Sequence, residues 1–165
     1  MENSLVEGIL KVCEKLNEHA VEYLIVGGAA VALHGFFRQS YNSSGQPTEK
    51  PDLDFWYNST YDNYFKLLDA LEGLGLDIAE FKAETAPNPQ KSFFRFEQAE
   101  FTLDFLPELP GLTRFRPSYE KRVISKINEI EIPFIDYTDL IQNKEALGRP
   151  KDIEDIQQLR AKRKN

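Results

Sequence analysis

The chain of 165 residues carries a formal net charge of −7, with 28% charged and 41% hydrophobic residues. This length fits one domain, 1–165, with an ordinary hydrophobic core. The acidic balance argues against a broad nucleic-acid-binding surface, and the single cysteine, Cys13, excludes an intrachain disulfide. The longest apolar run, residues 21–37, contains Glu22 and His34 and is too short to span a membrane comfortably. We therefore expect a cytoplasmic protein with no membrane partner.

Helices and strands are expected to alternate along the first part of the chain. Apolar residues repeat at helical spacing from near Ser4 to near His19 and predict a helix. Residues 22–28 form a short apolar run that is typical of a buried strand, and residues 29–35 resemble a short helix. Residues 38–50 are rich in Ser, Asn, Gly and Pro and predict a long loop.

The rest of the chain continues this mixed pattern. Alternating apolar and polar residues predict strands, two pairs of which are joined by short turns as hairpins. Proline and glycine mark the helix ends. The core is expected at about 20–136 and terminal helices at about 137–163. The expected elements are a strand at 50–56, a helix at 60–75, a turn at 85–90, hairpins at 92–97 with 100–106 and 121–127 with 129–135, and helices at 138–147 and 150–162.

Residues 50–56, KPDLDFW, place two aspartates one residue apart in an otherwise apolar segment. In an extended strand, Asp52 and Asp54 share one face while Leu53 and Phe55 share the other. The two carboxylates repel each other, by roughly 1 kcal/mol in water and several times more at a low-dielectric site. The pair therefore requires either solvent, as on an ordinary half-exposed strand, or a bound cation.

A glycine pair and a third aspartate extend this pattern. Gly27 and Gly28 separate a predicted strand from a predicted helix. That position is typical of a phosphate site, or of a tight turn that needs glycine for its geometry alone. Asp104 lies within the strand sequence FTLDFL, where a buried carboxylate is costly without a cation or a hydrogen-bond donor.

The order of these features resembles the DNA polymerase beta-type nucleotidyltransferase superfamily: Gly-Gly after a strand, Asp-x-Asp on the next strand, and a third Asp on a later one. Residues 137–159, YTDLIQNKEALGRPKDIEDIQQL, are similar to the C-terminal segment of minimal nucleotidyltransferases and of the nucleotidyltransferase component of abortive-infection and toxin–antitoxin systems. The resemblance implies an α/β (α+β) fold with a mixed central β-sheet flanked by helices and a helical C-terminus.

The same resemblance implies that Asp52, Asp54 and Asp104 are catalytic and bind metal. In this superfamily the three carboxylates hold two Mg²⁺ ions, for which Mn²⁺ can substitute, and such hard cations prefer carboxylate oxygens. Gly27 and Gly28 would bind the triphosphate of an NTP, with ATP the expected nucleotide. The repulsion between the paired aspartates is then relieved by the metal.

Basic residues are further candidates for binding the nucleotide. Arg38 follows the glycine pair, but residues 38–50 separate it from the aspartates more widely than in relatives, so this loop is either a substrate lid or an insertion. Lys144 is either a phosphate ligand or part of a solvated helix end. Arg149 and Lys151 are weaker candidates of the same kind.

The leading prediction is Mg²⁺-dependent transfer of a nucleoside monophosphate from an NTP to a hydroxyl group of a protein, RNA or small molecule. The alternative from another class is a partner protein in a toxin–antitoxin or regulatory complex, which keeps the fold with weak or absent catalysis. A metal-dependent hydrolase is less favoured because the sequence has no histidine cluster.

Overall fold

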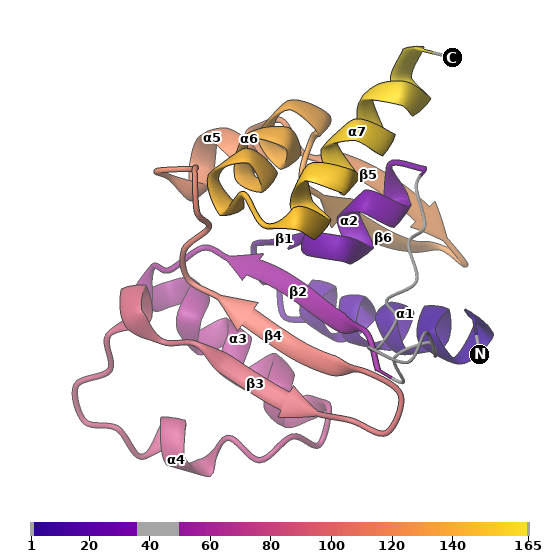
Figure 1. The fold of residues 1–165 in the computed structure, drawn as a ribbon. Coiled ribbons are helices and arrows are strands. Elements are labelled where there is room, and N and C mark those ends of the chain that lie inside the picture. The colour runs from indigo at the N-terminus through magenta and orange to yellow at the C-terminus, as the bar shows by residue number, and fades with distance from the viewer. Residues whose placement is uncertain (1, 36–49, 165) are drawn as a thin grey trace.

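The computed structural model describes residues 2–35 and 50–164. These residues form a six-stranded mixed β-sheet with helices on both faces (Figure 1). The strand order is β3-β4-β2-β1-β6-β5. Strands β2 and β4 are parallel, as are β1 and β6, and the other neighbouring pairs are antiparallel. The strands are β1 (Tyr23–Val26), β2 (Asp52–Tyr57), β3 (Phe94–Glu97), β4 (Thr102–Leu106), β5 (Val123–Ile127) and β6 (Ile130–Phe134).

Helices cover both faces of this sheet. Helices α1 and α3 pack together on one face, and α2, α6 and α7 lie on the other (Figure 1). The mixed sheet flanked by helices and the helical C-terminus confirm the predicted fold class. The helices are α1 (Glu2–Glu18), α2 (Gly27–Leu33), α3 (Tyr61–Gly73), α4 (Ala79–Lys82), α5 (Phe115–Glu120), α6 (Tyr137–Leu147) and α7 (Pro150–Lys164), with a 3₁₀ turn, η1, at Pro89–Lys91.

Alternation along β2 and β4 places the aspartates on the face opposite a buried aromatic pair. Phe55 on β2 stacks on Phe105 on β4, with ring centroids 5.0 Å apart, and both rings are buried. Leu53 and Leu103 precede them by two residues on the same face and are buried as well. Side chains at intervening positions, including Asp54 and Asp104, consequently point to the opposite face.

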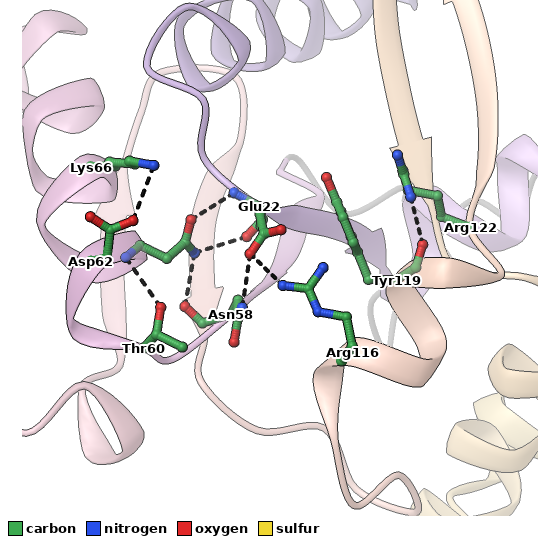
Figure 2. Close-up of polar contacts among 9 residues, drawn as sticks. Glu22, Asn58, Thr60, Asp62, Lys66, Arg116, Tyr119 and Arg122 are labelled. Atoms are coloured by element: carbon green, nitrogen blue, oxygen red, sulfur yellow. Dashed lines mark hydrogen bonds and ion pairs between the residues drawn. The ribbon is translucent and has the colours of Figure 1, made fainter.

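A cluster of polar side chains connects α3 and α5 to the end of the sheet where β1 begins and β2 ends (Figure 2). The Asn63 side chain accepts a hydrogen bond from the Glu22 backbone N–H at 2.7 Å and donates to the carbonyls of Glu22 and Asn58. The Glu22 carboxylate accepts hydrogen bonds from Arg116 at 2.8 Å and from Asn58 at 2.9 Å. These contacts hold α3 and α5 in place, and the Arg116 hydrogen bond is the main cause of the lowered Glu22 pKa.

Three short elements were missing from the predictions, and one helix begins early. Helix α5 was missed because Pro117 interrupts its sequence, yet proline in a first helical turn costs little since that N–H has no partner within the helix. Its Phe115 ring packs edge-on against Trp56 at 5.1 Å. The short α4 and η1 lack a detectable periodicity. Helix α2 begins at Gly27, two residues before the predicted start.

Two further predictions concern the loop and the membrane. Apart from Lys50, the predicted loop at 38–50 lies outside the described residues. Within 2–35 and 50–164, no helix is long and apolar enough to cross a membrane.

Candidate active site

A cleft of about 980 Å³ opens at one end of the sheet and is lined by residues of α1 as well as of α2, α6 and α7. It lies where β1 ends and where β2 and β4 begin, so residues distant in sequence meet at one place. The cleft wall includes both glycines, all three predicted aspartates and the leading lysine candidate: Gly27, Gly28, Asp52, Asp54, Asp104 and Lys144.

The β2–β4 register sets the carboxylates side by side. Asp54 pairs with Asp104 across the parallel strands, and Asp52 pairs with Thr102 one pleat away. Because side chains alternate along a strand, Asp52, Asp54 and Asp104 all lie on the face that carries the cleft. The three negatively charged side chains are thus gathered on two neighbouring strands, β2 and β4.

The neighbouring carboxylates and burial shift the pKa of Asp54. Burial, followed by the charges of Asp104 and Asp52, raises the pKa of Asp54 to about 7, and the positive charge of Lys144 opposes the rise. A carboxyl group in such a place gains from a cation that allows it to ionise. The ionisation of Asp54 is therefore sensitive to the contents of the cleft.

Arg95 on β3 binds Asp104 from its other side. The two residues are directly opposite in the antiparallel β3–β4 register. Nε and Nη2 of Arg95 donate to the two Asp104 carboxylate oxygens, each at 2.8 Å. This bidentate pair gives the buried carboxylate the partner that its position required.

Gly27 and Gly28 play different structural parts. Gly27 has φ +66°, and a Cβ atom there would overlap the Asp54 carboxylate, so no larger residue fits without displacing that group. A Cβ atom on Gly28 would meet nothing within 4 Å. Gly27 thus allows β1 to approach Asp54, whereas Gly28 lines the cleft and has open space where a side chain would begin.

Lys144 is buried, unlike the side chain of a solvated helix end. Its Nζ lies 3.1 Å from Asp152 Oδ1 and 3.1 Å from Asp155 Oδ2, and the side chain is 3% exposed. Gly148 ends α6 in the left-handed conformation, and α7 then packs against α6 so that both aspartates reach the lysine. Arg149 also binds Asp152, through its backbone N–H and its guanidinium.

These contacts determine the protonation of Asp152. Burial by itself would raise the pKa of Asp152, but hydrogen bonds from Arg149 and Lys144 outweigh it and lower that pKa to about 2. Asp152 therefore stays charged at neutral pH, and its ion pair with Lys144 joins α7 to α6 at the cleft wall.

The remaining candidates divide into two groups. Arg149 and Lys151 line the cleft, and the Arg149 side chain is already paired with Asp152. Arg38 lies outside the described residues.

Sequence reasoning missed Arg95, although the predicted hairpin placed it on the strand next to Asp104. Only the register, which the turn between the strands sets, shows that the two residues face each other.

The donor set suits a hard divalent cation, although the present arrangement is not a complete metal centre. Carboxylate oxygens are the ligands that Mg²⁺ prefers. Among residues 2–35 and 50–164, no three His, Cys, Asp or Glu side chains already converge as a metal-binding group. Asp54 and Asp104 are in register, but Arg95 occupies both Asp104 oxygens. The positive charge of Arg95 therefore competes with a cation for Asp104.

The fold is that of nucleotidyltransferases. The described chain is similar to the lincosamide antibiotic adenylyltransferase LnuA in its lincomycin-bound crystal structure, with a TM-score of 0.59 and 16% identity over 97% of this chain and 96% of that one. It also aligns with an antigenic nucleotidyltransferase-like protein from Paracoccidioides brasiliensis, with a TM-score of 0.49 and 18% identity over 93% of this chain and 73% of that one. No protein-family model and no curated protein sequence matches the chain.

Proposed function

We propose that this protein is a cytoplasmic Mg²⁺-dependent nucleotidyltransferase that moves a nucleoside monophosphate from an NTP to a hydroxyl group. The observation that carries the proposal is the in-register pair of Asp54 and Asp104, with Asp52 one pleat away, in a cleft that also includes the glycine pair. The fold shared with LnuA is consistent with this chemistry.

The three aspartates would hold two Mg²⁺ ions, with Mn²⁺ as a substitute. When bound, the metal neutralises phosphate charge and favours ionisation of the attacking hydroxyl. Asp52 and Asp54 would orient the nucleotide-associated ion through hard oxygen ligands. Asp104 would complete the second ion's ligand set and accept a hydrogen bond from the acceptor hydroxyl, which positions that group for attack.

The nucleotide, expected to be ATP, would lie with its triphosphate along Gly27 and Gly28. Open space beside Gly28 lets phosphate oxygens approach the backbone N–H groups. Lys144 would contribute as a fixed positive charge in the cleft wall, because Asp152 and Asp155 already hold its Nζ. Arg38 remains a proposed phosphate ligand on the basis of the sequence resemblance.

Small molecules are the first acceptors to test, before proteins and RNA. The adenylyltransferase with the similar fold was crystallised with lincomycin. In this chain, apolar side chains from α1 and α2, including Leu5, Ile9 and Leu33, line the same cleft as the carboxylates. A partly apolar molecule with a free hydroxyl would bury its apolar part against this wall.

A second candidate function is that of a catalytically weak partner protein in a toxin–antitoxin or regulatory complex. The observation that favours it is the Arg95–Asp104 pair, which occupies a carboxylate that catalysis would need. In that case Arg95 would hold the site closed permanently, and the fold would serve to bind another protein.

The deciding experiment uses α-³²P-labelled NTPs, Mg²⁺ or Mn²⁺, and three acceptor pools: hydroxylated small molecules, RNA and cell protein. Label transfer by the parent and its loss in Asp54→Asn and Asp104→Asn are expected. Asp62→Asn is the matched control, because Asp62 is an exposed residue of α3 paired with Lys66. Absence of both transfer and metal-dependent nucleotide binding would contradict the enzymatic function and leave the partner-protein alternative.

A further inference from the structure

Arg95 and Asp104 form an unequal pair. Both Asp104 carboxylate oxygens accept hydrogen bonds from the guanidinium at 2.8 Å. The Asp104 side chain is 6% exposed, whereas that of Arg95 is 55% exposed. The aspartate is therefore fixed within the sheet, while the arginine can turn into solvent without disturbing the core.

The oxygens that Arg95 holds are the ones that a cation in the cleft would need. Asp54 lies beside Asp104 on the neighbouring strand, so a divalent ion between them would coordinate Asp104. The guanidinium places a positive charge and two donors on this carboxylate, so it opposes the approach of a metal ion to the same group. Arg95 offsets one negative charge of the carboxylate group, whereas a divalent ion offsets two.

The freed guanidinium has a second use in the same cleft. Arg95 lines that cleft together with Gly27, Gly28 and the aspartates. Its planar set of donors binds phosphate oxygens as well as it binds a carboxylate. Release from Asp104 therefore supplies a positive charge where the triphosphate is expected.

Building on the nucleotidyl transfer proposed above, we propose that Arg95 is a displaceable counter-ion that occupies Asp104 until a divalent cation replaces it, and that Arg95 then binds the nucleotide phosphates. Arg95 thereby couples metal entry to nucleotide binding. The pair that favoured a permanently closed site becomes, on this proposal, the resting state of an active one.

The test compares Mn²⁺ binding, followed by electron paramagnetic resonance, in the parent, Arg95→Gln and Arg95→Lys. Loss of the competing guanidinium is expected to tighten binding of Mn²⁺ alone by about tenfold in Arg95→Gln. Arg95→Lys, which keeps the charge but cannot hold both oxygens, should give an intermediate affinity. Lys91→Gln is the control, since it removes one positive charge from an exposed pair with Glu108 and should bind Mn²⁺ like the parent.

A second measurement uses a non-hydrolysable ATP analogue in the presence of saturating Mn²⁺. Arg95→Gln should bind the analogue several-fold more weakly than the parent and Lys91→Gln. Equal Mn²⁺ affinity in the parent and Arg95→Gln would overturn the displacement. Unchanged analogue binding would overturn the phosphate role. Failure of every variant, parent included, to bind Mn²⁺ with or without the analogue would overturn the proposed metal-dependent function as well.

A measurement on the parent covers the case in which Arg95→Gln does not fold. The Nε–Hε signal of Arg95 in ¹⁵N-labelled protein, assigned by its absence in Arg95→Lys, reports the hydrogen bond to Asp104. Titration with Mg²⁺ should move this signal to the position of a solvated arginine. A signal that stays in place while the backbone amides of Asp52 and Asp54 respond to Mg²⁺ would overturn the proposal.

Discussion

Gly27 lies so close to Asp54 that a side chain at Gly27 would overlap the Asp54 carboxylate. Its φ of +66° adds a second restriction, because residues with a Cβ atom rarely adopt it. The neighbouring Gly28 meets neither restriction. Substitution by alanine should therefore have different effects at the two positions.

Gly27→Ala should lower the free energy of unfolding by about 1–2 kcal/mol from the backbone alone, and by more if Asp54 must move. Gly28→Ala should leave stability within about 0.5 kcal/mol of the parent, as for an ordinary surface change. If the Gly28 backbone contacts phosphate, its alanine variant should nevertheless weaken binding of the ATP analogue. Urea unfolding and analogue titration measure the two effects, and equal stability loss in both variants would contradict the proposed difference.

The raised pKa of Asp54 predicts a specific pH dependence of stability. Below about pH 3 the group is protonated in both the folded and unfolded states, so it contributes no difference. Between the ordinary aspartate pKa of 3.8 and about 7, the unfolded chain ionises first and folding stability falls with rising pH. Asp54→Asn, which cannot ionise, should therefore be more stable than the parent at pH 8, by at most about 4 kcal/mol, and should lose that advantage near pH 4.

Unfolding curves at pH 4 and pH 8 in metal-free buffer provide this measurement. Added Mg²⁺ should restore stability to the parent at pH 8 and have a smaller effect on Asp54→Asn. An advantage of the variant that is the same at both pH values would mean that titration of Asp54 is not its cause.

Lys144 is expected to be essential for stability, whatever its part in nucleotide binding. Lys144→Met removes the cation shared by two buried carboxylates, Asp152 and Asp155, and should cost about 3–5 kcal/mol. Lys151→Met is a suitable control, because Lys151 is exposed in the same cleft wall. Thermal unfolding of the two variants should differ widely, and similar melting temperatures would show that the ion cluster contributes little.

The polar cluster at the far end of the sheet should affect folding without affecting the cleft. Asn63→Ala leaves the backbone N–H and C=O groups of Glu22 without their side-chain partner and should cost about 2–3 kcal/mol. Binding of Mn²⁺ and of the ATP analogue to the folded fraction should match the parent. Weakened binding would show that this end of the sheet is coupled to the cleft.

Local sequence patterns predicted the parts of the site that depend on alternation. Asp52 and Asp54 share a face because they lie two positions apart on a strand, and the same reasoning oriented Asp104. The pairing of Arg95 with Asp104 could not be obtained in this way, because it depends on hairpin register. The burial of Lys144 was also out of reach, because it depends on how α7 packs against α6 after Gly148.

The helices likewise differ in how well the local sequence predicts them. Long periodic segments such as α3 and α7 were predicted near their observed bounds. Helix α5, whose sequence Pro117 interrupts, also depends on the contact of Phe115 with Trp56, a residue distant in the sequence. Tertiary packing, rather than local propensity, stabilises such short elements.

The alignment of Asp54 with Asp104 also limits how this gene can change in length. Deleting one codon between Asp52 and Asp54 would turn one of the two carboxylates toward the apolar side occupied by Phe55, because side chains alternate along β2. Insertions between α4 and η1, at residues 83–88, leave that alternation intact. Descendants of this sequence should therefore differ in length in such connections, while the spacing within β2 and β4 stays constant.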